Sequence, residues 1–382
     1  MSEVWIVSAA AVSALAPDLA GLWQGLLAGR SGVAPVDSFD ASPYYCHLAA
    51  EVPGLEPSQA GGRLASLLER ASEDIGTVPG DAVLFGASLK GEMDLKQHFW
   101  DRHPAGTESD PGSLFDGLGP ARRVADLFSL EDPGVNFNAA CASSLVALAM
   151  AAENIARGRA EVALVWAAEI VSEFVFAGFA SLKALTPDGC RPFDVNRNGL
   201  VLGEGAAFLL LMSAERARRE GYQPLASCRG WGIANDASHL TAPERHGRGL
   251  LKACRRALER AGLPPEKVAA VKAHGTGTIH NDAMELAAFA NLFGCRRPPL
   301  FSVKGSVGHT LGAAGALETA IAVKALQSAT LPPTVGLEDP EAGFRGQLSA
   351  ASRDFSGTNL LLTNSGFGGV NTALLLTAGE KP

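Results

Sequence analysis

Short apolar runs alternate with longer segments of helical composition along this chain of 382 residues. The apolar runs at residues 81–86, 160–168, 268–273 and 300–303 have the length and the residue types of buried β-strands. Strands that alternate with helices are typical of an α/β protein. The segment 92–116 is polar and contains Gly and Pro, so we expect an irregular excursion on the surface.

Two parts of the chain repeat the same order of features. Residues 135–155 and 300–326 each contain an apolar strand, then a polar turn with a reactive residue, then a helix made largely of small residues. This likeness predicts an internal duplication. Because no low-complexity linker separates the two copies, we expect two intimately packed halves, 1–215 and 216–382.

The composition is that of a globular protein, with 47% hydrophobic and 19% charged residues. The net charge is −8, and no run of Lys and Arg carries interleaved aromatic residues, so we expect no nucleic acid partner. Residues 1–20 contain no Lys or Arg and therefore lack the basic start of a secretory signal. No uncharged apolar run is long enough to cross a bilayer. These features predict a soluble, cytoplasmic protein with no membrane partner.

Six scattered cysteines form no C-x-x-C pair, which argues against a disulfide framework and against a zinc cluster. Cys141 differs from the others, because it follows the strand-like segment 134–137 and precedes a helix predicted at 143–157. The backbone N–H groups and the dipole of a helix N-terminus favour a thiolate, so this position predicts a nucleophile with a lowered pKa. The alternative is a buried cysteine that packs as a small hydrophobe.

Three further runs place reactive residue types where a predicted strand ends: residues 271–278, 301–309 and 363–369. The first contains His274, for which a hydrogen-bonded structural histidine is the alternative. The second contains Lys304 and His309, on either side of a glycine-bearing turn that leads into a helix predicted at 311–326. The third contains Phe367 among glycines, whose backbone can approach a ligand while the aromatic ring acts as a gate.

These residues and their order resemble the β-ketoacyl-acyl carrier protein synthases of the decarboxylating Cys-His-His type. The runs that carry the resemblance are 140–143, 191–194 with 203–206, 274–278, 302–304 with 308–309, and 364–369. The resemblance implies a thiolase fold, a five-layered αβαβα arrangement built from two duplicated halves. It also implies an acyltransferase that performs a decarboxylative Claisen condensation and makes a 3-oxoacyl-acyl carrier protein.

The resemblance implies a role for each reactive residue. Cys141 attacks an acyl thioester and carries the acyl chain, which splits one difficult step into two. The backbone N–H groups of Cys141 and Phe367 form the oxyanion hole. His274 and His309 donate Nε2–H to the carbonyl oxygen of a malonyl thioester, which loses carbon dioxide to become the attacking enolate.

Supporting residues are implied in the same way. Lys304 supports His309 and a carboxylate, and Glu285, eleven residues after His274, matches the position of that carboxylate. Asp282 is similarly placed. His280 has no third ligand at short spacing, so no metal is expected.

The implied partner is an acyl carrier protein, whose phosphopantetheine arm carries the substrates, and no other cofactor is expected. Thr276 and Thr278 match threonines that bind this arm. The family implies a dimer, of which a homodimer is the simplest case and a heterodimer with a chain-length partner the alternative. Because the carrier protein is acidic, docking needs a local basic patch. The arginines considered for it are Arg63, Arg70, Arg122 and Arg123.

Two departures from the family pattern indicate a specialised polyketide or aryl polyene pathway instead of housekeeping fatty acid elongation. The gate run 364–369 has one aromatic residue where two are usual, and the run 166–169 reads Trp-Ala-Ala-Glu in place of Gly-Gly-x-Glu. Two other functions remain as alternatives. A non-catalytic chain-length partner would lack Cys141, and a Cys/His acyltransferase or thioesterase would not need His309.

Overall fold

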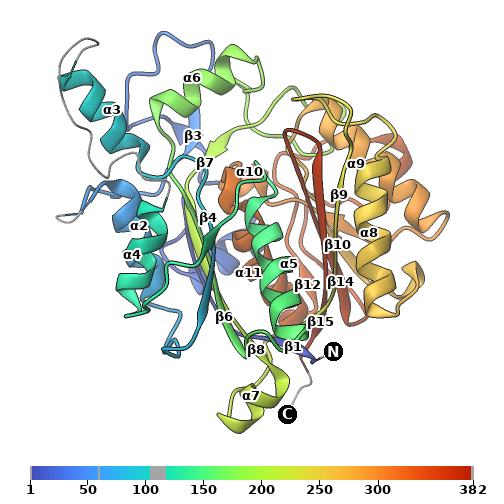
Figure 1. Cartoon of the computed structure of the whole chain (residues 1–382). Coiled ribbons are helices and arrows are strands. Elements are labelled where there is room, and N and C mark those ends of the chain that lie inside the picture. The colour runs from blue at the N-terminus through green and yellow to red at the C-terminus, as the bar shows by residue number, and fades with distance from the viewer. Residues whose placement is uncertain (1, 59–60, 104–117, 380–382) are drawn as a thin grey trace.

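The computed structural model describes residues 2–58, 61–103 and 118–379, and its centre is a ten-stranded sheet (Figure 1). The strand order is β11-β10-β14-β15-β9-β1-β8-β6-β4-β5. Four of these strands lie where the sequence predicts them, which confirms an α/β protein. The strands of this sheet are β1 (Val4–Ser13), β4 (Val83–Ala87), β5 (Val135–Asn136), β6 (Val162–Glu169), β8 (Gly205–Ser213), β9 (Ala226–Asn235), β10 (Ala270–Lys272), β11 (Leu300–Phe301), β14 (Asn359–Gly366) and β15 (Val370–Ala378).

The sheet contains the same five-strand pattern twice. From the centre outward, each half places its first strand, then its fifth, fourth, second and third. In both halves the first two pairings are antiparallel and the last two are parallel. The predicted duplication is therefore confirmed. The division after residue 215, which falls within α7 (Ala214–Arg219), stays a prediction.

Helices form three layers around the two halves of the sheet. Helices α5 and α11 lie between the halves, α2 and α4 cover the outer face of the first half, and α8 and α9 cover that of the second (Figure 1). This is the five-layered αβαβα arrangement that the family resemblance implies. Besides α7, the helices of the described residues are α1 (Leu19–Leu27), α2 (Arg63–Ser72), α3 (Met93–Arg102), α4 (Gly119–Leu127), α5 (Ser143–Ala156), α6 (Glu173–Ser181), α8 (Arg248–Ala261), α9 (Ile279–Phe293), α10 (Lys304–Val307) and α11 (Ala314–Ser328). There are also two small sheets. One contains β2 (Ala34–Pro35), β3 (Leu48–Ala50) and β7 (Leu202–Gly203), and the other contains β12 (Thr330–Leu331) and β13 (Arg353–Asp354).

The two central helices, α5 and α11, pack unusually close to each other. Each follows the third strand of its half, is rich in Ala, and is largely buried. A Cβ added to Gly315 would lie 2.5 Å from the amide nitrogen of Leu145, so only glycine fits there. The amide of Ala316 donates a hydrogen bond to Ser144 Oγ at 3.0 Å. The loops that lead into the two helices therefore lie close together.

The segment predicted as an irregular excursion is helical in its first part. Helix α3 has Asp94 in its first turn and Arg102 in its last, where each charge favours the helix dipole. The prediction is wrong for these residues because residues 93–97 are largely helix formers and the side chain of Met93 is buried. Residues 104–117 lie outside the described residues. Among the described helices, none combines the length and the apolar character needed to span a membrane.

Candidate active site

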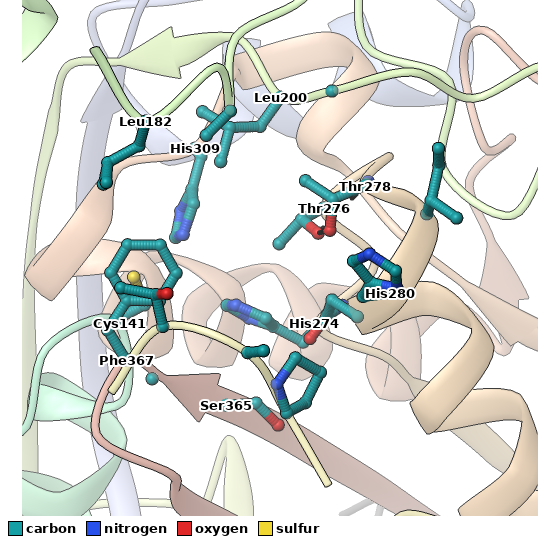
Figure 2. Close-up of a pocket in the computed structure, with 18 of the residues that line it drawn as sticks. Cys141, Leu182, Leu200, His274, Thr276, Thr278, His280, His309, Ser365 and Phe367 are labelled. Carbon is teal, nitrogen blue, oxygen red and sulfur yellow. Dashed lines mark hydrogen bonds between the residues drawn. The ribbon is translucent and has the colours of Figure 1, made fainter. Parts of the chain in front are cut away.

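Cys141 lies in the turn between β5 and α5, one residue before the N-cap of the helix. Ser143 shapes this turn, because its Oγ accepts from the amide of Ala139 at 2.8 Å and donates to the carbonyl of Ala140 at 2.6 Å. Ala140 has a left-handed φ of 48°. The turn presents Cys141 to a pocket of about 410 Å³ (Figure 2).

Burial changes the acidity of this thiol. It raises the pKa of Cys141 to about 12, because the thiolate would lose its water, and the positive charge of Lys304 only partly opposes this. The lowered pKa predicted from the helix N-terminus is therefore wrong for the unliganded protein. Loss of hydration outweighs the effect of the helix dipole, so Cys141 is a protonated thiol until substrate arrives.

We expect the rate at which iodoacetamide alkylates Cys141 to rise about tenfold per pH unit between pH 7 and pH 9. The raised pKa keeps the thiolate a small fraction of the total over this range, so its amount scales with hydroxide concentration. Peptide mass spectrometry measures the rate at each cysteine, and the exposed Cys295 serves as an internal control for the reagent. A rate at Cys141 that levels off below pH 8 would contradict the raised pKa.

His274 and His309 reach Cys141 from the second half of the chain. His274 follows β10, and His309 follows α10. Their rings lie 5.1 Å apart at an angle of 82°. The sulfur of Cys141 and a nitrogen of each imidazole all lie within 4.8 Å of one another. The structure thus brings these three residues together in one pocket (Figure 2).

Hydrogen bonds around His274 determine which of its nitrogens carries the proton. Lys304 Nζ lies 3.3 Å from Nδ1 of His274, and Asn364 Nδ2 lies 2.9 Å from it. Both of these groups are donors, because an ammonium has no lone pair and the Asn364 amide nitrogen also donates to Glu318 Oε2 at 2.9 Å. Nδ1 therefore accepts, and the proton of the neutral ring is on Nε2.

Both imidazoles are neutral. Burial holds the pKa of His274 and of His309 well below the usual range, and the positive charge of Lys304 lowers both further. A neutral imidazole can donate a hydrogen bond to a carbonyl oxygen and strengthen it as negative charge develops there.

Lys304 pairs with Glu318 and not with Glu285. Its Nζ donates to Glu318 Oε1 at 2.5 Å and to the carbonyl of His274 at 2.6 Å. Among the described residues we find no hydrogen bond from Lys304 to His309. The expected pairing with Glu285 is therefore wrong, because α11 places its own carboxylate against the ammonium group. The support of His309 by Lys304 stays a prediction.

Glu285 and Asp282 instead hold the turn that follows β10. Glu285 accepts hydrogen bonds from the first two amides of the turn 274–277, at 2.7 and 2.6 Å. Asp282 accepts from the last two, at 3.0 and 3.1 Å. Burial raises the pKa of both carboxyl groups, and these amides oppose the increase. The two carboxylates position His274 through its backbone.

The other predicted residues of the site line the same pocket. Thr276 and Thr278 have their Oγ1 atoms 2.8 Å apart, and the exposed His280 lies beyond them (Figure 2). Phe367 is 37% exposed and stacks on Phe179 of α6, with ring centroids 5.9 Å apart. Its ring therefore lies over the pocket beside Cys141, the position expected of a gate.

The gate loop lies directly against the turn of the nucleophile. A Cβ added to Gly366 would come within 2.6 Å of the Ala139 carbonyl and 3.2 Å of the Cys141 amide nitrogen. Only glycine allows this approach of two backbones.

The sulfur and the imidazole nitrogens of this cluster are also the donor types of a zinc site. Two buried ammonium groups, Lys304 and Lys272, lie close enough to both histidines to lower their pKa. The same positive charges oppose a divalent cation, so we assign no metal to these residues.

Sequence reasoning did not find Glu318. It is the one carboxylate in the small-residue helix predicted at 311–326, and a carboxylate flanked by small and apolar residues is the available signal. Two of the docking candidates form ion pairs within the protein. Arg63 pairs with the buried Glu204 at 2.8 Å and Arg123 with Glu92 at 3.1 Å. Docking by the four arginines stays a prediction.

The run 166–169, which differs from the family pattern, begins with a tryptophan that lies away from the pocket. Trp166 faces the outer layer of the first half, and a Cβ added to its neighbour Gly86 would lie 2.3 Å from the indole. The large residue on β6 is thus accommodated by glycine on β4. This departure fills the core and gives no information on substrate range.

Comparison with known proteins gives the family. Models of the N-terminal and C-terminal domains of β-ketoacyl synthases match residues 67–217 and 225–338. The chain is 31% identical to the 3-oxoacyl-[acyl-carrier-protein] synthase 2 of Coxiella burnetii and 32% identical to a putative polyketide β-ketoacyl synthase 1 of Streptomyces virginiae, over 98% of each protein. The solved ishigamide ketosynthase/chain length factor is 28% identical, with a TM-score of 0.90 over 99% of each chain. The chain belongs to the β-ketoacyl synthase family and has its thiolase fold.

Proposed function

We propose that the protein catalyses decarboxylative Claisen condensation of an acyl-enzyme thioester with malonyl-acyl carrier protein, giving a 3-oxoacyl-acyl carrier protein. One observation carries the proposal: a cysteine sulfur and two neutral imidazoles lie within 4.8 Å of one another in one pocket. A nucleophile and two hydrogen-bond donors are what the two half-reactions need.

In the first half-reaction, Cys141 attacks the carbonyl carbon of the acyl thioester. The backbone N–H groups of Cys141 and Phe367 stabilise the oxyanion. When the intermediate collapses, the carbon–sulfur bond to the phosphopantetheine arm breaks, and the proton of the Cys141 thiol ends on the departing sulfur. Thr276 and Thr278 bind the arm along the pocket wall.

In the second half-reaction, the malonyl thioester oxygen accepts hydrogen bonds from His274 and His309. These bonds stabilise the enolate that remains when the carbon–carbon bond to carbon dioxide breaks. The enolate carbon attacks the acyl carbonyl, and the sulfur of Cys141 departs as thiolate and takes a proton from solvent. Lys304 and Glu318 hold His274 in its donating form, as their hydrogen bonds suggest.

The proposed partner is an acyl carrier protein, in line with the name of the Coxiella relative, and no metal or redox cofactor takes part. We propose a dimer through the sheet edge at β5, where Val135 is 52% exposed. A homodimer is the simplest form. The ishigamide structure pairs a ketosynthase with a chain length factor, which supports a heterodimer as the alternative. Six free cysteines support a reducing, cytoplasmic location.

We infer a specialised polyketide or polyene pathway, supported by the polyketide relative from Streptomyces virginiae. The 3-oxoacyl-[acyl-carrier-protein] synthase 2 of Coxiella burnetii is nearly as similar in sequence. The acyl group that the protein accepts must therefore distinguish the two kinds of pathway. The two alternative functions lose support at the site. The non-catalytic partner does not need Cys141, and simple acyl transfer or hydrolysis does not need a second neutral histidine at this distance.

The test is turnover by the purified protein with acyl and malonyl carrier proteins. We expect intact-protein mass spectrometry to find one acyl group on Cys141 and [14C]malonyl carrier protein to release labelled carbon dioxide. A panel of acyl groups identifies the preferred chain. Acylation without carbon dioxide release would support the acyltransferase alternative, and no acylation at all would overturn the proposal.

A further inference from the structure

Lys272 is a second buried lysine beside the site. It is the last residue of β10, has no exposed surface, and precedes His274 by two residues. Its ammonium group forms an ion pair with Glu318 Oε2, whereas Lys304 contacts Oε1 of the same carboxylate. One carboxylate of α11 is therefore held between two lysines.

This arrangement contains more positive charge than pairing requires. Burying a charge is costly, and Lys304 alone would neutralise Glu318. The charged groups that face Lys272 are Glu318 on α11, Lys304 on α10 and Glu285 on α9. Burial raises the pKa of Glu285, and its oxygens are already used by backbone amides. Burial alone would raise the pKa of Glu318, but the two lysines outweigh burial and hold the pKa below its usual range, so two ammonium groups share one ionised carboxylate.

We propose that Lys272 is a positioning residue that acts through Glu318 to keep His274 in its neutral, Nε2-donating form. The inference rests on the proposed condensing function. Lys272 fixes the same Oε2 that accepts from Asn364, and the Asn364 amide is one of the two donors to His274 Nδ1. The charge of Lys272 also disfavours protonation of both histidines.

Lys272→Met tests this proposal, because methionine has nearly the same length but no charge. We expect the imidazole pKa of His274 and His309 to rise on the order of one unit. The acid side of the pH profile for carbon dioxide release should move to higher pH by a similar amount. Lys252→Met, at an exposed lysine of α8, is the matched control and should leave the profile unchanged.

NMR titration of 15N-labelled histidine side chains measures the imidazole pKa values without turnover. If the wild-type protein releases no carbon dioxide, the proposed function fails, yet the titration still decides the role of Lys272. Imidazole titration that is the same in Lys272→Met and wild type overturns the proposal, even when activity falls equally at every pH, because that result indicates a structural role only.

A double variant covers the case in which Lys272→Met does not fold. Glu318→Gln alone leaves two buried lysines without a carboxylate, whereas K272M/E318Q leaves one. We expect the double variant to be the more stable of the two in urea denaturation. The reverse order would overturn the pairing on which the inference depends.

Discussion

Replacing Cys141 with alanine is expected to abolish acylation and to reduce condensation on the order of 10⁴-fold or more. The sulfur is the group that forms the bond to the acyl chain in the proposed reaction. The fold should survive, because losing one buried sulfur costs about 1 kcal/mol. Release of carbon dioxide from the malonyl thioester should remain measurable, because its hydrogen-bond donors are untouched.

Intact-protein mass spectrometry and release of labelled carbon dioxide separate the two half-reactions of this variant. Cys254→Ala is the matched control, because Cys254 is equally buried but lies in α8, outside the pocket. A Cys141→Ala protein that still acquires an acyl group would place the nucleophile elsewhere.

His274→Ala is expected to have the opposite pattern. Acylation of Cys141 should continue, whereas carbon dioxide release should fall about 10²–10³-fold, the usual cost of losing one preorganised donor to a developing oxyanion. The loss has a second cause, because Lys304 and Asn364 would then direct their donors at empty space.

The control for this variant is His246→Ala, which removes an exposed histidine outside the pocket. Single-turnover measurement of acylation and of carbon dioxide release gives the two rates independently. If His274→Ala slowed acylation and left decarboxylation intact, His274 would be a general base for Cys141 and the proposed division of roles would be wrong.

The reactive residues could be predicted from the sequence because each lies on a segment that follows a strand, and strands can be found from the hydrophobic pattern. The partner of Lys304 could not be predicted in this way. Glu285 and Glu318 both lie on helices near the site, and the choice between them depends on how α9 and α11 rotate against the sheet, which short-range spacing does not encode.

The raised pKa of Cys141 could not be predicted from the sequence for a related reason. Its position at a helix N-terminus is local and could be predicted, whereas the desolvation that raises its pKa comes from residues of both halves. The buried position of Trp166 could not be predicted from nearby residues either, because the space that its side chain fills is provided by Gly86 on the neighbouring strand.

The contact between Gly315 and Leu145 has a consequence for the reaction itself. Cys141 lies on the loop that starts α5, and His309 lies on the loop that leads to α11, so the separation of the two helices acts as a spacer between sulfur and imidazole. A methyl group at residue 315 would push the helices apart and lengthen that gap, with every reactive residue still present. The distance between the Cys141 sulfur and the His309 imidazole thus depends on Gly315, a residue that has no side chain.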